Sequence, residues 1–259
     1  MRRERKLKAI LWDVDGTLAD TEEAHRIAFN RAFAACGSDL FWDPEVYRSL
    51  LRVTGGKERI RHALEQSGVA STHIDPTWLA TIHALKTELY SEAIASGKVA
   101  LRPGVVRLVA EAQSRGVLQV IATTTTRGNV QALVRANWVE SPFVDMACAD
   151  TAPHKKPVPD VYFAALKMAG VPPHEALAIE DSRNGVIAAR GAGIAVLVTP
   201  SSFTSTDNFD GATCVISSLG DDSSPAVSLR SAIAVPPLVT VDWLQSVMNN
   251  NIVAPHSGL

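Results

Sequence analysis

The chain has 259 residues, of which 46% are hydrophobic and 20% are charged. This composition supplies enough apolar material for one large domain or two smaller ones. The net charge of -2 disfavours a protein whose main partner is DNA or RNA. The 3 cysteines are scattered and form no CxxC pair, so we expect neither a disulfide framework nor a zinc site.

No segment predicts a membrane span or an export signal. The apolar runs are far shorter than the ~18 residues of a spanning helix. Only a short apolar stretch follows the basic start before Asp13, and a signal peptide needs a longer one. We therefore expect no membrane partner and a cytoplasmic protein, or a stromal one if the source is a photosynthetic eukaryote. We also expect a monomer.

The N-terminal part combines one strand with a long helical segment. The apolar run Leu7–Trp12 predicts a buried parallel strand. Apolar residues then recur at helical spacing from Thr21 onward, and no convincing strand follows before residue 100. Residues 21–99 are therefore expected to form an all-helical cap domain. Its further helices are predicted at Pro44–Leu51, Lys57–Gln66 and Pro76–Ala95.

From residue 100 onward, predicted strands and helices alternate. The strands are predicted at Val117–Ala122, Val144–Ala147, Ala176–Ile179 and Ile194–Val198, and the helices at Val105–Ser114, Gly128–Ala136, Asp160–Met168 and Asn184–Arg190. Alternation of this kind indicates an α/β fold with a doubly wound, mostly parallel sheet. Residues 1–20 and 100–259 would form this Rossmann-like core, with the cap inserted between two hinges.

The C-terminal extension, residues 220–259, carries weaker signals. The segment Asp221–Pro237 is rich in serine and proline, which predicts an irregular connection. A last helix is expected at Val241–Met248.

The strongest chemical signal is the motif Asp-x-Asp-Gly-Thr at residues 13–17. It follows the first strand, and ligands of open α/β sheets bind beyond the carboxyl ends of the strands. Two carboxylates this close repel each other unless a cation compensates them or one takes a proton. An ordinary acidic turn is the simpler alternative. A calcium loop fails on spacing, because Leu18 stands where that loop needs glycine.

Three later strand ends also carry polar residues. Thr123 follows one strand, Lys156 lies in a loop after another, and Glu180-Asp181 ends a third. Each can be an ordinary loop feature, but together they should converge on one crevice. Carboxylates suit Mg²⁺, which also takes phosphate oxygens, and a lysine and a hydroxyl suit the remaining phosphate oxygens. The set therefore favours phosphoryl transfer.

These motifs, in this order, resemble the phosphatases of the haloacid dehalogenase (HAD) superfamily, and the match spans most of residues 7–200. The helical insertion resembles the cap of that superfamily. The sequence is also similar to the CbbY-type subgroup, which are xylulose-1,5-bisphosphate phosphatases. That closer resemblance is carried by the segments Asp20–His25, Thr54–Arg59, His83–Glu88, Leu101–Gly104, Thr123–Thr125 and Glu180–Gly185.

The resemblance assigns chemical roles to the core residues. It implies that Asp13 is the nucleophile, which forms an aspartyl phosphate. It implies that Asp15 is the general acid and then the general base. A free aspartate titrates at about 3.9, so we expect the environment to raise the pKa of Asp15. Phosphate would be held by Thr123, Thr124 and Lys156, and Mg²⁺ by the Asp13 carboxylate, the Asp15 backbone carbonyl, Asp181 and Glu180.

The cap is expected to select the substrate. Gly56 opens a helix that carries Lys57 and Arg59, and free N–H groups with two cations suit a second phosphate. Glu22 and His25 are candidates for binding sugar hydroxyls or for positioning the general acid. Weaker candidates for substrate contact are Tyr47, Arg48, Lys86 and Arg102. The expected substrate is a small sugar phosphate, with xylulose 1,5-bisphosphate as the best choice.

Other functions stay open at this point. A mutase of the β-phosphoglucomutase type would share the core and the cap, and a phosphoglycolate phosphatase would share the chemistry. A non-catalytic receiver domain also combines aspartates, a threonine and a lysine, but the insertion fits it badly. A dehalogenase is disfavoured by Asp15 and the expected magnesium site.

Overall fold

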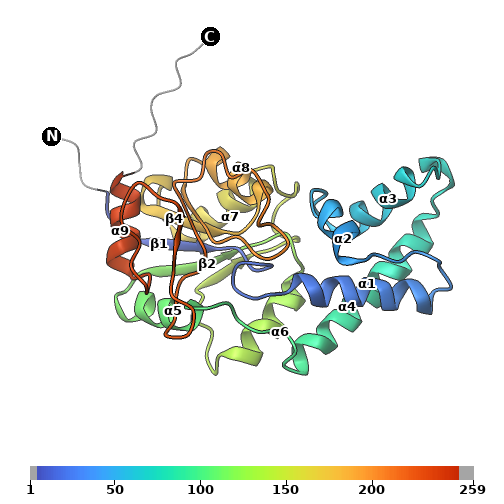
Figure 1. The fold of residues 1–259 in the computed structure, drawn as a ribbon, viewed down its shortest axis with the longest axis horizontal. Coiled ribbons are helices and arrows are strands. Elements are labelled where there is room, and N and C mark those ends of the chain that lie inside the picture. The colour runs from blue at the N-terminus through green and yellow to red at the C-terminus, as the bar shows by residue number, and fades with distance from the viewer. Residues whose placement is uncertain (1–4, 251–259) are drawn as a thin grey trace, which may run out of the picture.

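A computed structural model of the chain describes residues 5–250. The outermost parts of the expected core, residues 1–4 and 251–259, lie outside the described residues. Figure 1 shows a sheet covered by helices, with a separate group of helices, α1 to α4, projecting from one end. No helix within residues 5–250 is both long and apolar enough to cross a membrane.

The core is built on a sheet of seven strands in the order β3-β2-β1-β4-β5-β6-β7. All neighbours are parallel except β6 and β7, which are antiparallel. This confirms the predicted α/β fold with a doubly wound, mostly parallel sheet. The strands are β1 (Ala9–Trp12), β2 (Leu118–Ala122), β3 (Asp145–Ala147), β4 (Ala176–Glu180), β5 (Ala195–Val198), β6 (Cys214–Ile216) and β7 (Ser228–Arg230).

Helices cover both faces of the sheet. One hydrophobic cluster joins the sheet to α5 (Val105–Ser114), α6 (Arg127–Asn137) and α9 (Val241–Asn250). A second cluster joins the opposite face to α7 (Asp160–Ala169) and α8 (Arg183–Gly191). Because both faces are buried, the central strands are mostly apolar. The expected helix near the C-terminus is confirmed as α9.

The expectation of a wholly irregular segment at Asp221–Pro237 was wrong, because β7 lies within it. All three residues of β7 are exposed, so the strand lacks the apolar alternation by which a sequence shows a strand. Its pairing with β6 comes from tertiary structure alone.

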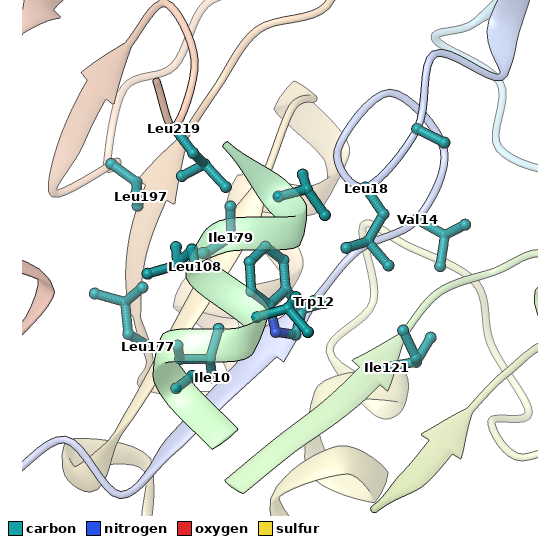
Figure 2. Packing of buried hydrophobic residues seen from close by; sticks show 14 of the residues in the cluster. Ile10, Trp12, Val14, Leu18, Leu108, Ile121, Leu177, Ile179, Leu197 and Leu219 are labelled. Carbon is teal, nitrogen blue, oxygen red and sulfur yellow. The ribbon is translucent and has the colours of Figure 1, made fainter. Parts of the chain in front are cut away.

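Trp12 anchors the first strand from beneath α5. Figure 2 shows its indole between β1 and the helix, close to Leu108 of α5 and Ile179 of β4. The indole N–H donates to Gln119 Oε1 at 3.1 Å, and Gln119 Nε2 donates to the carbonyl of Val109 at 3.0 Å. This buried chain of hydrogen bonds satisfies its own polar groups and fixes the end of β1 from which the Asp-x-Asp loop begins.

Four α-helices form the projecting group: α1 (Glu22–Ala35), α2 (Pro44–Leu50), α3 (Gly56–Gln66) and α4 (Pro76–Ala95). Two of them begin with an aspartate cap and a proline in the first turn. Asp43 accepts from the N–H of Val46, and Asp75 accepts from that of Thr77. The helices share a hydrophobic cluster of their own, in which Phe29 and Phe33 of α1 pack against Trp42, just before α2.

The two connections between the cap helices and the core run side by side. The N–H of Asp20 donates to the carbonyl of Ala100 at 3.0 Å, and the N–H of Arg102 donates to that of Leu18 at 2.9 Å. Both connections to the cap helices therefore leave the core at one place, immediately after the Asp-x-Asp loop.

Candidate active site

The polar residues predicted at the strand ends meet along one edge of the sheet. Asp13 follows β1, Thr123 follows β2, and Glu180 is the last residue of β4. Since β1 lies between β2 and β4 and all three are parallel, their carboxyl ends open into the same crevice. Lys156 enters it from the loop that joins β3 to α7.

Gly16 allows the loop after β1 to pass close to the end of β4. Its φ is 78°, a value that side chains other than that of glycine rarely adopt. A Cβ at this position would lie 2.2 Å from Oδ2 of Asp181. The glycine of the motif is therefore required both by the backbone conformation and by the approach of Asp181.

Lys156 is the central cation of the crevice. Its Nζ lies 2.6 Å from Oδ1 of Asp13 and 2.6 Å from Oε1 of Glu180. Burial alone would lower the pKa of this lysine, but the two carboxylates outweigh burial and raise it. The side chain is therefore a permanent ammonium group that neutralises part of the acidic charge around it.

Asp13 is buried and unusually basic for an aspartate. Burial raises its pKa to about 7, against the pull of Lys156 and with a contribution from Glu180. The hydroxyl of Thr17 donates to its Oδ2 at 3.1 Å. The carboxylate is thus oriented by a lysine on one oxygen and a hydroxyl on the other, and it carries a charge that its surroundings do not fully compensate.

The charge balance fits a divalent cation. Asp13, Glu180 and Asp181 each place a carboxylate oxygen so that the three oxygens lie within 4.8 Å of one another, and the ammonium of Lys156 contacts Asp13 and Glu180. Burial, and then the nearby charge of Asp13, raises the pKa of Asp181 well above its usual range. Oε2 of Glu180 is buried without any hydrogen-bond partner among the described residues. An oxygen-rich, under-compensated cluster of this kind suits Mg²⁺.

Asp15 lies in a different electrostatic environment. Its Oδ1 is 3.0 Å from Nε2 of His25, and Nδ1 of His25 is 2.7 Å from Nζ of Lys86. The lysine can only donate, so Nδ1 accepts and the N–H of His25 lies on Nε2, toward Asp15. Burial would raise the pKa of Asp15, but His25 outweighs it and lowers the value to about 2.

This result corrects the expectation that the environment raises the pKa of Asp15. The reason is the chain of donors from α1 and α4, which stabilises the carboxylate. Burial and the charge of Lys86 lower the pKa of His25, and burial lowers the pKa of Lys86 to about 8. In this arrangement Asp15 is an ionised carboxylate.

A cavity of about 640 Å³ lies between the cap helices and the carboxyl edge of the sheet. It brings together most of the predicted site residues from both parts of the chain. From the core these are Asp13, Asp15, Thr123, Thr124, Lys156 and Asp181, and from the cap helices Glu22, His25, Arg48, Gly56, Arg59 and Lys86.

Four predicted residues do not line this cavity. Glu180 lies buried behind Lys156, and Tyr47 lies buried behind Glu22. Lys57 is exposed on the outside of α3. The guanidinium of Arg102 donates to the backbone carbonyls of Gly16, Thr199 and Pro200, so it is held by the backbone of the core and does not face the cavity.

The cap supplies a second polar chain. The hydroxyl of Tyr47 donates to Oε2 of Glu22 at 2.8 Å and accepts from Arg59 at 2.9 Å. The guanidinium of Arg59 also lies 5.2 Å from the centre of the Tyr47 ring. Tyr47 therefore holds an acidic and a basic side chain at the cavity wall, where the first suits sugar hydroxyls and the second an anion.

Several cavity residues were not predicted as site residues. Asn184 of α8 donates to the carbonyl of Arg52 and, at 3.0 Å, to the hydroxyl of Thr54. These contacts fasten the loop before α3 to the core. No local sequence pattern identifies them, because they join residues more than a hundred positions apart. Further residues of this kind that line the cavity are Arg52, His83, Lys155 and Phe203.

Comparison with known proteins identifies the family. The haloacid dehalogenase-like hydrolase family matches residues 10–199. The chain belongs to this family. The resemblance inferred from the strand-end motifs is therefore confirmed, and the Asp-x-Asp loop, Thr123, Lys156 and Asp181 all lie within the matched region.

The relatives include CbbY proteins. The chain is 47% identical over 236 residues to the protein CbbY of Rhodobacter capsulatus, covering 90% of this chain and 99% of that protein. A crystal structure of a CbbY variant from Rhodobacter sphaeroides in complex with xylulose-(1,5)bisphosphate is 46% identical, with a TM-score of 0.75 over 82% of this chain and 94% of that one. A β-phosphoglucomutase from Clostridium difficile shares the fold at 18% identity, with a TM-score of 0.73 over 95% of this chain and 99% of that one.

Proposed function

We propose that this member of the family is a Mg²⁺-dependent phosphatase that hydrolyses a small sugar phosphate, and that xylulose 1,5-bisphosphate is its substrate. The observation that carries the proposal is that polar groups of the core and a cation of the cap line the same cavity. Asp13 and Lys156 lie at its core side, and Arg59 lies at its cap side. A bisphosphate has an anionic group for each side, and a similar protein has been crystallised with this compound.

The first half of the reaction transfers the phosphoryl group to Asp13. A carboxylate oxygen of Asp13 attacks phosphorus, and the ester bond breaks with its electron pair moving to the sugar oxygen. Asp15 supplies the proton which that oxygen needs to leave. The pKa of Asp15 is about 2 without substrate. Asp15 therefore takes up its proton when the substrate binds, because the negative charge of the substrate raises the pKa of a neighbouring carboxyl.

The second half releases phosphate. Asp15, now a carboxylate held by His25, takes a proton from a water molecule that attacks the phosphoaspartate. The bond between phosphorus and the Asp13 oxygen then breaks and restores the free carboxylate. Lys156 and the hydroxyl and N–H groups at Thr123 and Thr124 hold the phosphoryl oxygens through both steps.

A magnesium ion would be held by Asp13, Asp181 and Glu180, with the backbone carbonyl of Asp15 as a further oxygen. When bound, it offsets the repulsion between the anionic nucleophile and the phosphate. We also propose that residues 21–99 act as a lid, hinged at the paired connections, which excludes water until the ester is in place.

A phosphate-release screen tests this function. The purified protein is incubated with Mg²⁺ and with pentulose and hexose mono- and bisphosphates, including xylulose and ribulose 1,5-bisphosphate, and with phosphoglycolate. We expect free phosphate, most rapidly from xylulose 1,5-bisphosphate and abolished by EDTA. An isomeric sugar phosphate without free phosphate would instead indicate a mutase. A stable phosphoprotein without turnover would indicate a non-catalytic phospho-acceptor.

A further inference from the structure

Tyr162 of α7 lies directly behind the acidic cluster and outside the cavity. Its side chain is fully buried, and its hydroxyl donates to Oε1 of Glu180. Its ring lies 5.2 Å from Nζ of Lys156. Burial raises the pKa of Tyr162 well above its ordinary value, so the phenol remains a hydrogen-bond donor. The tyrosine therefore contacts two site residues without lining the cavity.

The two carboxylate oxygens of Glu180 have different contacts. Oε1 accepts from both Tyr162 and Lys156, whereas Oε2 has no partner in the described part of the chain. The other side of the carboxylate lies against the first turn of α8. A Cβ at Gly185 would be 1.8 Å from Oε2, so a larger residue there would displace the carboxylate. The carboxylate is clamped between a phenol, an ammonium and a backbone.

Without the phenol, this clamp would loosen on one side. Glu180 would keep only Lys156 as a donor, and rotation could bring both of its oxygens to that ammonium. Lys156 would then be drawn away from Asp13, and the carboxylate of Glu180 would no longer be held in the cluster with Asp13 and Asp181. Residues that orient ligands in this way commonly change metal affinity by 10-fold to 100-fold, about the range seen for supporting hydrogen bonds around metals.

We propose that Tyr162 is a positioning residue for the metal site: its hydroxyl holds the carboxylate of Glu180 in place beside Asp13 and Asp181. This inference rests on the proposed magnesium-dependent function, but its test does not require turnover. The ring of Tyr162 packs under Lys156 as a separate contribution, which the Phe variant retains.

The test compares Tyr162→Phe with the wild type by titrating Mg²⁺ into the metal-free protein in a calorimeter. We expect the dissociation constant of Mg²⁺ to rise about 10-fold. With a phosphate ester as substrate, kcat should fall at limiting Mg²⁺ and recover in part at high Mg²⁺, while KM for the ester changes less than about twofold. Unchanged Mg²⁺ affinity in a folded Tyr162→Phe protein would overturn the proposal.

Two further variants separate positioning from general packing. Ser218→Ala removes another buried hydroxyl, which accepts from the N–H of Gly220 at 3.2 Å, and it should leave Mg²⁺ affinity unchanged. In the Glu180→Gln background, Tyr162→Phe should have no further effect on Mg²⁺ affinity, because the hydroxyl acts through Glu180. Equal effects in both backgrounds would refute that route. Mg²⁺ binding with this pattern but no phosphate release would sink the proposed activity and leave the positioning role standing.

Discussion

At the scale of single residues, Asp13 carries the proposed chemistry. Replacing it with asparagine removes the nucleophilic oxygen while keeping the shape and an acceptor for Lys156. We expect Asp13→Asn to lower phosphate release by at least about 10³-fold. Circular dichroism should show an unchanged fold. Asp39→Asn, at an exposed position of the cap, is the matched control and should keep full activity. Substantial turnover by Asp13→Asn would refute the assignment of the nucleophile.

Lys86 is a buried ammonium group, and its ionisation should be visible in stability. Burial lowers its pKa to about 8 in the folded protein, whereas the pKa of a lysine in an unfolded chain is about 10.4. Between these values the unfolded state binds more protons, so the contribution of this group to the free energy of unfolding increases as the pH rises from 8 to 10. Below pH 8 both states are charged and the burial cost is paid in full.

The comparison of Lys86→Met with the wild type isolates this effect. We expect the stability of the wild type relative to Lys86→Met to increase by up to about 3 kcal/mol across this pH range. Urea unfolding at several pH values measures the difference. Lys98→Met removes an exposed lysine, and its difference from the wild type should stay constant. A flat difference for Lys86→Met as well would show that Lys86 is not a desolvated ammonium group.

At the scale of elements, the start of α8 is shaped by the acidic cluster. Alanine normally stabilises a helix by about 1 kcal/mol relative to glycine, but a Cβ at Gly185 would collide with the carboxylate of Glu180. We therefore expect Gly185→Ala to destabilise the protein by about 1–3 kcal/mol and to weaken Mg²⁺ binding. Thermal unfolding with and without Mg²⁺ measures both effects.

The matched control lies in α6, where a Cβ at Gly128 would meet nothing within 4 Å. Gly128→Ala should leave Mg²⁺ binding unchanged and be neutral or stabilising by up to about 1 kcal/mol. If both alanines stabilised the protein equally, the carboxylate of Glu180 would not be clamped against α8.

Helical geometry also shows what the sequence could and could not predict. Lys57 and Arg59 were both expected at the second phosphate. Residues two apart in a helix point about 200° from one another, so only one of them can line the cavity, and it is Arg59. That separation was available from the sequence. The position of the Arg102 side chain could not be predicted, because its carbonyl acceptors come from loops distant in the chain.

At the scale of the whole molecule, the sequence predicted the core better than the contact between its two parts. The strand-end motifs could be placed together because parallel strands share an edge. The low pKa of Asp15 could not be predicted, since it depends on how α1 and α4 bring His25 and Lys86 to the loop. The contacts of Asn184 could not be predicted either, because they form only once the loop before α3 lies against α8. Local patterns thus identify the chemistry, while docking of the cap sets its electrostatics.

The division of the cavity between core and cap leads to a test of substrate selection. Arg59 lines the cavity and Lys57 does not, although both are cations in the first turn of α3. Loss of a charge-assisted hydrogen bond to an anion costs about 1.5–3 kcal/mol, which corresponds to a change of about 10-fold to 100-fold in affinity. We expect Arg59→Gln to raise KM for xylulose 1,5-bisphosphate by this factor, with a much smaller effect on a pentulose monophosphate.

Lys57→Gln is the matched control, because it removes the same charge from the outward face of the same helix. Its KM values for both substrates should stay within about twofold of the wild type, since exposed charges at this range are screened. Steady-state kinetics with both esters measures the four values. Equal losses on the two substrates in Arg59→Gln would place Arg59 in support of the fold of the cap, through Tyr47, and not at a second phosphate. Equal effects of Lys57→Gln and Arg59→Gln on the bisphosphate would mean that the long-range field of the cap, not a direct contact, attracts the substrate.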